Sequence, residues 1–401
     1  MITINTAESA LKNIYLESVI EDINNKTNPF LTMIGKNTKT IAEKDAKAYI
    51  RYGNEASVGA GAEDGPLPTS TEKLAEISVP LKNLFGSFQI TDKAIKAAQN
   101  SPGAFASLIG GEMKNLVSTA QANLNRMVYG NGNPYLAWTS AVNQAAGTIT
   151  VPTRFLGNLR VGQIVRFYNS NNVLVGAVTG STITAINATT GVVNVAPGLA
   201  AQPWDRIFIF DANPQNIEMN GVDSIFMQNT LYNLARAEHP EILPLVRGIQ
   251  GTLATPQVLI NEERILDFLY ELEEHAEAMP TDIILTHPTV QKALFENLKD
   301  NRTNIGTTEF AGGFKGFTFN GIPMYSDVRC MAGTVYALNS DGWAMQQLVD
   351  WTWLEGDDGS ILRPVANKPV FSATLVKYAD LICEKPFLQG KLTGFTGNVW
   401  R

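Results

Sequence analysis

The sequence predicts an α+β protein in which a β-rich segment interrupts a larger mixed unit. One apolar stripe continues through residues 102–128, which indicates a long helix. Residues 148–210 are rich in Val, Ile and Thr and poor in charge, whereas helical and strand patterns interleave from residue 211 onward. No unit of 20–50 residues recurs, which excludes solenoids and propellers.

The N-terminal part is expected to be a helix followed by an arm, over residues 1–48. Residues 8–24 place Leu11, Ile14 and Val19 at helical spacing, which predicts a short amphipathic helix. Asn28-Pro29 is expected to end it, because the segment up to about Ile50 has no helical period. We therefore expect extended chain after Asn28.

A long hairpin is expected next, over residues 49–93. Two strand patterns, at 47–52 and 74–90, flank a segment rich in glycine with two prolines. Such a tip cannot bury itself, so we expect it to lie on a neighbouring molecule. Its charged residues are the candidate assembly contacts: Arg51, Glu55, Glu63, Asp64, Glu72 and Lys73.

The long helix belongs to a third segment, residues 94–147. Ser101-Pro102 provides an N-cap followed by proline at the first helical position, and the run from Gly130 to Pro134 ends the helix. Gly110 and Gly111 each weaken the interior by about 1 kcal/mol relative to alanine. We expect these two glycines to mark a bend.

Residues 148–210 are expected to form an inserted, barrel-like domain of about five short strands. Turn signals at 169–172, Gly180 and 189–191 separate its strand patterns. The rest of the chain, 211–401, is expected to hold a helix from Asn261 to Met279 and the further elements that follow. These are a strand at 282–285, a helix at 288–299, a hairpin turning at Asn320-Gly321 and late strands over 370–395.

Motifs that carry chemistry are absent from the sequence. His239, His275 and His287 are scattered without metal-ligand spacing, so surface or capping roles are expected. The Gly59–Gly65 cluster is not a phosphate loop, and residues 355–359 fit a polar turn better than a calcium loop. Trp343, Trp351 and Trp353 are expected in the core. We therefore expect no enzyme activity, cofactor or metal.

The charge and the cysteine content exclude further classes of protein. The formal charge is −7, and residues 261–278 hold −6 of it on one side of the expected helix. Clustered Lys/Arg are lacking, which argues against a free nucleic-acid binder. The two cysteines are too few for a disulfide framework, and no signal peptide or membrane span is expected. We therefore expect the protein to be made in a reducing compartment inside a cell.

The order of these elements resembles the tailed-bacteriophage major capsid protein of the Hong Kong 97 fold. Three stretches are similar to parts of proteins in that family. They are Asn220-Gly221-Val222, Thr286–Val290 and the hairpin at Phe317–Tyr325 followed by Asp327. In the terms of that family, residues 49–93 would be the E-loop and 94–147 the spine helix and P-domain. Residues 211–401 would be the A-domain with closing P-domain strands.

The resemblance implies a structural protein that forms pentamers and hexamers of an icosahedral head around double-stranded DNA. Portal and scaffolding proteins are implied as partners, with a decoration protein as an optional one, and DNA is enclosed without sequence-specific binding. No membrane partner is implied, and assembly is expected in the host cytoplasm before the protein resides in the virion capsid. A separate scaffold is expected because the first helix lies close to residue 1. No covalent crosslink through Lys73 is expected, because no asparagine partner can be identified for it.

Two other functions are compatible with parts of the sequence. An encapsulin-like bacterial compartment would share the whole fold and enclose an enzyme instead of DNA. A β-rich tail or adhesin protein is suggested by residues 148–210 alone, and the long helix argues against it.

Overall fold

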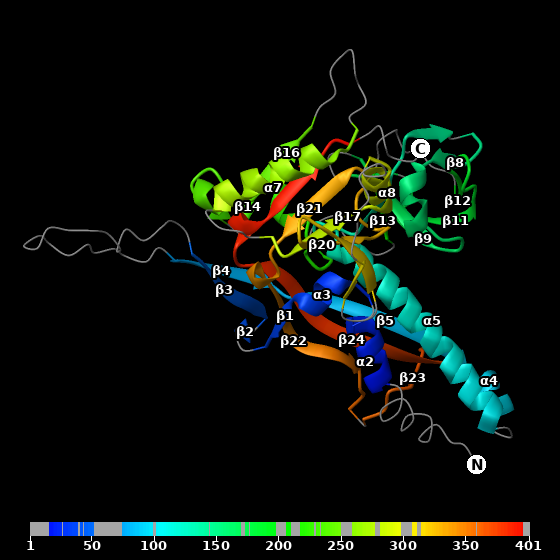
Figure 1. Cartoon of the computed structure of the whole chain (residues 1–401). Helices are drawn as coiled ribbons and strands as arrows, with labels where there is room; N and C mark the ends of the chain where they lie inside the picture. Colours follow the sequence, from blue (N-terminus) through cyan, green and yellow to red (C-terminus); the bar gives the residue numbers. More distant parts are fainter. Residues whose placement is uncertain are drawn as a thin grey trace, which may run out of the picture. The chain divides into compact units, whose positions relative to one another are not determined.

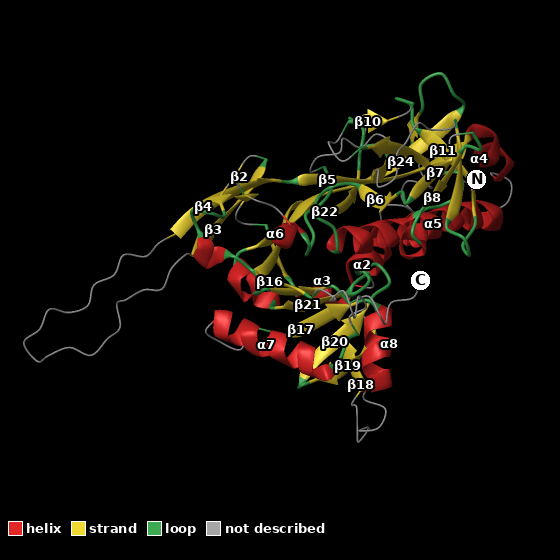
Figure 2. Cartoon of the chain, turned by 90° about the horizontal axis from the view of Figure 1, so that it is seen from above, coloured by secondary structure: helices red, strands yellow, loops and turns green. Residues whose placement is uncertain are grey.

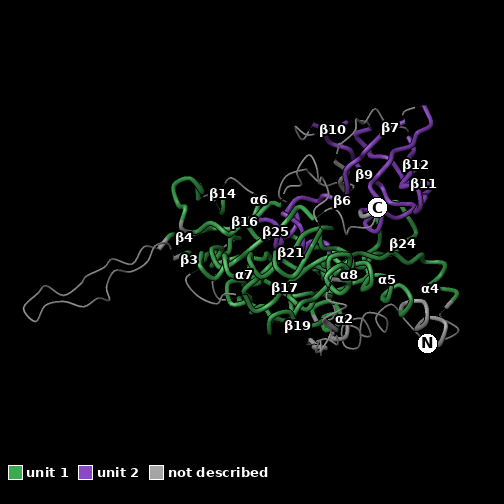
Figure 3. The backbone as a smooth tube through the Cα atoms, turned by 45° about the horizontal axis from the view of Figure 1, so that its top comes forward, with its two compact units in different colours: residues 1–125, 225–398 green, residues 126–224, 399–401 purple. Residues whose placement is uncertain are grey.

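The computed structural model describes most of the chain: residues 16–25, 27–38, 41–42, 44–51, 74–98, 102–143, 145–169, 173–175, 177–197, 206–209, 217–227, 230–232, 234–249, 259–276, 281–297, 307–310, 314–357 and 359–395. The chain divides into two compact units (Figure 3). Unit 1 comprises residues 1–125 and 225–398, and unit 2 comprises residues 126–224 and 399–401. None of the described helices is long and apolar enough to cross a membrane.

The N-terminal segment of unit 1 contains two helices, α2 (Leu16–Asn25) and α3 (Pro29–Met33). The expected extended chain after Asn28 is wrong for residues 29–33, because Asn28 begins a new helix there, and strands follow from Gly35 onward. Its side chain accepts the N–H of Phe30 at 2.9 Å, and Pro29 occupies the first helical turn. Phe30 is fully buried, with its ring edge-on to Trp343 at 5.7 Å. Burial of this apolar pair outweighs the weak helical period of the local sequence.

The predicted hairpin strands are present as β3 (Asp45–Arg51) and β4 (Leu74–Pro80), which pair antiparallel from Asp45↔Pro80 to Arg51↔Leu74. A short strand, β2 (Ile41–Ala42), completes this three-stranded sheet. The single strand expected at 74–90 is wrong. Pro80 ends β4, since proline has no N–H for a ladder, and β5 (Lys82–Thr91) joins another sheet.

That second sheet has the order β1-β22-β24-β23, with β5 also paired to β24. Its strands are β1 (Gly35–Asn37), β22 (Trp343–Trp353), β23 (Arg363–Pro364) and β24 (Val370–Cys383). Trp343, Trp351 and Trp353 are buried, as predicted.

The long helix, α5 (Pro102–Val128), follows α4 (Asp92–Ala98) and has the predicted bounds. Figure 1 shows α5 beside β5 and β24. Its distance from β5 is short at Gly86, where a Cβ would lie 3.0 Å from Cδ1 of Leu116. The predicted N-cap, Ser101, lies outside the described residues.

The third sheet of unit 1 has seven strands in the order β16-β25-β21-β17-β20-β19-β18. Their bounds are β16 (Leu245–Gly248), β17 (Ile283–Thr286), β18 (Thr307–Phe310), β19 (Phe314–Phe319), β20 (Ile322–Ser326), β21 (Thr334–Leu338) and β25 (Gly390–Thr393). Short elements precede it: α6 (Ser224–Met227), β14 (Thr230–Leu231) and β15 (Leu234–Ala235).

Two helices, α7 (Glu262–Ala276) and α8 (Pro288–Asn297), share one buried core with this sheet (Figure 2). Both helices and the adjoining strand β17 were predicted. The predicted cap is confirmed, because Oδ1 of Asn261 accepts the N–H of Arg264 at 3.2 Å. The predicted hairpin turn is confirmed too, with positive φ at both Asn320 (49°) and Gly321 (80°).

Unit 2 contains an eight-stranded sheet with the order β6-β13-β9-β11-β12-β8-β7, and β10 pairs with β9. The strands are β6 (Tyr135–Trp138), β7 (Ala141–Asn143), β8 (Thr148–Thr150), β9 (Ile164–Tyr168), β10 (Leu174–Val175), β11 (Ser181–Ile186), β12 (Val192–Ala196) and β13 (Arg206–Ile209). It holds more strands than the five expected and begins at β6, before the predicted start at 148.

The sheet of unit 2 must curl strongly. β6 and β7 lie at opposite ends of the strand order, yet only Thr139 and Ser140 separate them in the chain. The two ends of the sheet are therefore close together, as in a barrel. The enclosed core includes Leu136, Val165, Phe167 and Val193.

Candidate assembly surfaces

The predicted contact residues fall mostly outside the described part of the chain. Arg51 is the last residue of β3, paired with Leu74. Glu55, Glu63, Asp64, Glu72 and Lys73 are outside the described residues. Gly110 and Gly111 lie within α5, which is one continuous helix through both positions, so the bend remains a prediction.

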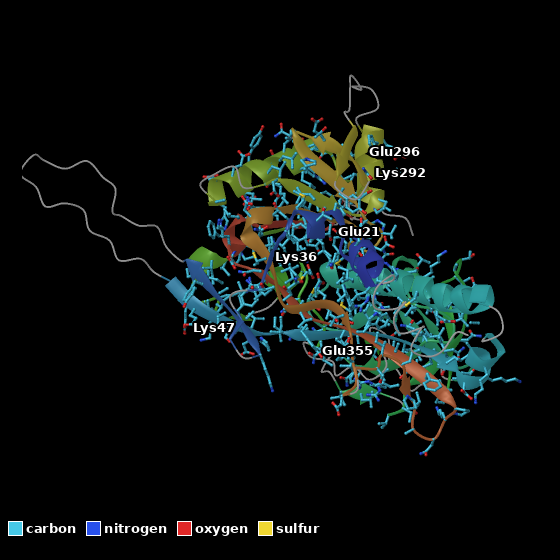
Figure 4. All side chains as sticks on the ribbon, turned by 90° about the horizontal axis from the view of Figure 1, so that it is seen from below. Glu21, Lys36, Lys47, Lys292, Glu296 and Glu355 are labelled. Carbon is cyan, nitrogen blue, oxygen red and sulfur yellow. The ribbon has the colours of Figure 1, made fainter. Side chains whose placement is uncertain are left out.

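The hairpin sheet has one buried and one exposed side. Ala48, Ile50, Ile77 and Val79 are buried, and these small and β-branched side chains alternate with exposed ones. The exposed side carries Lys47, Tyr49 and Glu76 (Lys47 is labelled in Figure 4). Lys47 pairs with Glu76 at 2.8 Å, and this hydrogen bond and the carboxylate charge raise the pKa of Lys47. Tyr49 is 60% exposed, so an aromatic ring is available to another molecule two residues before the candidate contact Arg51.

The exposed side of β5 is a second candidate surface, and its side chains carry no charge. Its exposed side chains are Asn83, Phe85, Ser87 and Gln89, and Phe85 is 62% exposed. The alternation follows the strand period, because the intervening Leu84 and Phe88 are buried. A surface of this composition can contact another subunit without desolvating a charge.

The outer side of α7 is acidic, as predicted from the sequence. Glu262, Glu263, Asp267 and Glu274 are exposed, whereas the apolar stripe of Ile265, Phe268, Leu269, Leu272 and Ala276 is buried. Nε of Arg247 on β16 donates to Glu271 at 2.6 Å. The helix lies directly on β25, since a Cβ at Gly390 would be 2.7 Å from Cζ of Phe268.

A buried polar chain connects α3, α5 and the loop after β20. Nδ2 of Asn28 donates to Oδ1 of Asn125 at 2.8 Å, and Nδ2 of Asn125 donates to Oδ2 of Asp327 at 2.7 Å. The N–H of Arg329 donates to Oδ1 of Asp327 at 2.7 Å. Burial raises the pKa of Asp327 despite these hydrogen bonds. These hydrogen bonds fix the loop after β20 to the long helix α5.

A second buried cluster joins α2 to the two longest strands. Nζ of Lys377 on β24 lies 2.8 Å from Oδ1 of Asp350 on β22 and 3.3 Å from Oδ1 of Asn24 on α2. Burial opposes ionisation of both charged groups and lowers the pKa of Lys377. For Asp350, the Lys377 charge and the hydrogen bonds outweigh burial, so its pKa is lowered.

Within unit 2, residues Glu218–Ser224 close the C-terminal end of α5. Arg126 is paired with Glu218 through two hydrogen bonds, and both residues are buried. The N–H of Val222 donates to the carbonyl of Val128 at 2.7 Å. A Cβ at Gly221 would lie 2.1 Å from the carbonyl oxygen of Met127 and 2.6 Å from that of Val128, so only glycine fits. This packing explains the glycine in the Asn220-Gly221-Val222 stretch.

The described residues include no group of three His, Cys, Asp or Glu that could hold a metal. His287 has the predicted capping role: its Nδ1 accepts the N–H of Thr289 at 3.2 Å at the start of α8. Cys330 and Cys383 are buried, and burial raises the pKa of the Cys383 thiol. These groups are components of the folded core.

Sequence reasoning missed all three polar clusters. Asn24 and Lys377 are 353 positions apart, and Arg126 and Glu218 are 92 apart. No local spacing pattern indicates such pairs. The available signal was Arg126 itself, a charged residue next to the apolar stripe of α5.

No family model and no curated protein matches the sequence. Among solved structures, a chain of the cyanophage A-1(L) capsid asymmetric unit is similar over 93% of each chain, with a TM-score of 0.53 and 14% identity. A Mycobacterium phage Bobi chain aligns over 99% of this chain and 100% of its own (TM-score 0.45, 8% identity). An encapsulin complex from Synechococcus elongatus aligns over 92% and 88% (TM-score 0.44, 10% identity). From the similarity to the cyanophage chain, which extends over nearly all of both chains, it follows that this protein has the Hong Kong 97-type α+β capsid fold.

Proposed function

We propose that this protein is the major capsid protein of a tailed phage, which associates into pentamers and hexamers of a closed icosahedral head around double-stranded DNA. The observation that carries the proposal is the fold similarity to the cyanophage A-1(L) capsid chain over 93% of both chains. Since a shared fold does not by itself imply a shared function, the surfaces must agree with a shell role as well.

The surfaces support association with further copies of the chain. The hairpin sheet and the outward side of β5 expose Tyr49 and Phe85 without a dominant charge of one sign. Most of the net charge belongs to α7, which leaves near-neutral surface elsewhere. We propose that the hairpin residues Arg51, Glu55, Glu63, Asp64, Glu72 and Lys73 contact a neighbouring subunit.

Other phage proteins would take part in assembling the shell. Portal and scaffolding proteins would act during assembly in the host cytoplasm, and the finished shell would be the virion capsid. Unit 2 would face outward, brace neighbouring subunits and offer a site for a decoration protein. The lack of clustered Lys/Arg suits a container that must let DNA move, because fixed cations would retain phosphates.

Electron microscopy of the purified full chain, produced with its phage's other assembly proteins, tests the function. Closed icosahedral shells containing DNA are expected. Shells that contain an enzyme and no DNA would support the encapsulin-like compartment instead. Trimeric fibres would support the tail or adhesin alternative, and either outcome would overturn the proposal.

Replacing residues 133–217, which hold the whole sheet of unit 2, by a short linker from Gly132 to Glu218 tests the bracing role of unit 2 separately. Shells of lower thermal or mechanical stability are expected, because contacts between neighbours would be lost. Shells of unchanged stability would contradict bracing while leaving the capsid function intact.

A further inference from the structure

Three side chains of unit 1 meet in a geometry that allows a covalent reaction. They are Asn24 on α2, Asp350 on β22 and Lys377 on β24. Nζ of Lys377 lies 3.3 Å from the amide oxygen of Asn24 and 2.8 Å from Oδ1 of Asp350. Nδ2 of Asn24 donates to Oδ2 of Asp350 at 3.0 Å. An amine, an amide and a carboxylate are therefore in mutual contact.

Two of the three groups are closed to water, whereas the Asp350 side chain is 30% exposed. Lys377 is 2% exposed and Asn24 is 7% exposed, and the Trp351 ring centroid lies 5.9 Å from Nζ. Side chains of Lys are almost never fully buried unless paired. Here burial lowers the pKa of Lys377, which increases the fraction of neutral amine, the nucleophilic form.

The position of Asp350 is what distinguishes this site from a simple ion pair. Its carboxylate contacts both the attacking nitrogen of Lys377 and the amide nitrogen of Asn24 that would leave. A carboxylate in hydrogen-bond reach of both nitrogens can carry protons from one to the other. The three groups are also held by separate, well-buried elements, which maintains a high effective concentration.

The geometry points to an intrachain isopeptide bond between Lys377 and Asn24, formed with Asp350 as the proton carrier. This inference concerns one chain and does not depend on the proposed shell function. It also differs from a crosslink between subunits, because all three residues belong to the same compact unit.

The reaction balances without an external reagent. Asp350 takes a proton from the Lys377 ammonium, and the neutral Nζ attacks Cγ of Asn24, forming the new C–N bond. Nζ then loses a second proton through Asp350. Both protons pass to Nδ2, the Cγ–Nδ2 bond breaks, and the nitrogen leaves as ammonium. The products are a secondary amide, one ammonium ion and the regenerated Asp350 carboxylate.

Such a bond would attach α2 to β24 permanently. The noncovalent alternative holds α2 at this point only by hydrogen bonds, which open whenever the helix frays locally. The bond would close a loop over 353 positions of sequence separation, so complete unfolding would leave the two segments joined.

Intact mass spectrometry of the denatured full chain tests the inference, together with peptide mapping. The expected mass is lower than the sequence mass by one ammonia, and the peptides containing Asn24 and Lys377 are expected to be joined. A mass equal to the sequence mass after prolonged incubation at neutral pH would overturn the inference. So would a loss of ammonia with the two peptides separate, which would indicate a succinimide at an asparagine.

Variants assign the roles of the three groups. Asn24→Ala and Lys377→Arg are expected to abolish the mass loss, and Asp350→Asn is expected to slow it at least tenfold in folded protein. Lys96→Ala is the control, because Nζ of Lys96 pairs with Asp92 on α4 at 2.7 Å and not with Asp350; it should react like the wild type. A loss of water instead of ammonia would assign the bond to Asp350 and overturn the role of Asn24.

Discussion

The guanidinium of Arg126 donates to both carboxylate oxygens of Glu218, at 2.9 and 2.5 Å, and both side chains are about nine-tenths buried. The pair joins the end of α5 to the segment that returns from the β-rich sheet of unit 2. Nη1 of Arg126 also lies 3.4 Å from the carbonyl oxygen of Tyr135. This arrangement fixes both chain segments at the base of unit 2.

Breaking that pair on one side should destabilise the chain strongly. Arg126→Met leaves the Glu218 carboxylate buried without a partner, which costs about 3–5 kcal/mol. Urea denaturation of the variant measures the loss. The double variant Arg126→Met/Glu218→Gln should recover much of it, because no buried charge remains. A single variant within about 0.5 kcal/mol of wild type would contradict the importance of the pair.

Gly221→Ala should be poorly tolerated. The added Cβ would lie 2.1 Å from the carbonyl oxygen of Met127, so the backbone must move and the bond from Val222 to Val128 should break. We expect a loss of about 2–4 kcal/mol in unfolding free energy. Gly35→Ala is the control, since its Cβ would meet no atom within 4 Å. Equal effects of the two substitutions would contradict the steric explanation.

Asp282 should make stability depend on pH. Its carboxylate accepts the N–H of Ser340 at 2.9 Å, but burial raises its pKa. The raised pKa means that the folded state favours the protonated form. Its contribution is present below the unfolded pKa of about 3.9 and is lost as the pH rises through the folded value.

Asp282→Asn tests this dependence, because the amide keeps an acceptor for the Ser340 N–H and the Ser340 hydroxyl can accept from its NH₂. Unfolding free energies measured from acidic to neutral pH should shift in favour of the variant as the pH rises. A difference that stays constant over that range, or moves the other way, would be evidence against the burial effect.

Gly111→Ala tests the predicted bend in α5. Its Cβ would meet nothing within 4 Å, so the variant subunit should gain up to about 1 kcal/mol from helix propensity alone. If the helix bends in an immature shell, the stiffer variant should form fewer such shells. Thermal melting of free subunits and counts of shell forms in micrographs measure the two effects. Normal proportions of both shell forms would contradict the bend.

Phe85→Asp tests the uncharged surface of β5. Phe85 is 62% exposed, so the subunit should fold with nearly unchanged stability, whereas a buried contact between subunits would lose affinity. Val328→Asp is the control, at 68% exposure on a loop of the same unit. Sedimentation of assembled particles should fall for the first variant only. An equal loss in both would remove the β5 surface as a candidate contact.

Local patterns predicted much of this fold. The bounds of α5 follow from its capping signals, and the hairpin at Asn320-Gly321 follows from turn chemistry that needs positive φ at both residues. The amphipathic pattern of α7 likewise predicted its buried and acidic sides. In each case the deciding residues are neighbours in sequence.

The wrong predictions have physical causes that cannot be detected from a local sequence pattern. Asn28 begins a helix because Phe30 finds Trp343 more than 300 positions away. The long strand at 74–90 divides because β4 and β5 pair with different strands, and Pro80 was the one local signal for that division. Neither Glu218 nor Asn24 has a sequence neighbour that suggests its distant partner. The predicted assembly contacts, Arg51 included, remain predictions.

The contact between Gly132 and Glu218 has a consequence for which changes in sequence the protein can accept. The N–H of Glu218 donates to the carbonyl of Gly132 at 3.0 Å, so the segment between them begins and ends at adjacent points. Insertions, deletions or whole replacements between these points would leave the ends of the remaining chain in register. We therefore expect Gly132 and Glu218 to be a suitable pair of attachment points for a foreign peptide or domain.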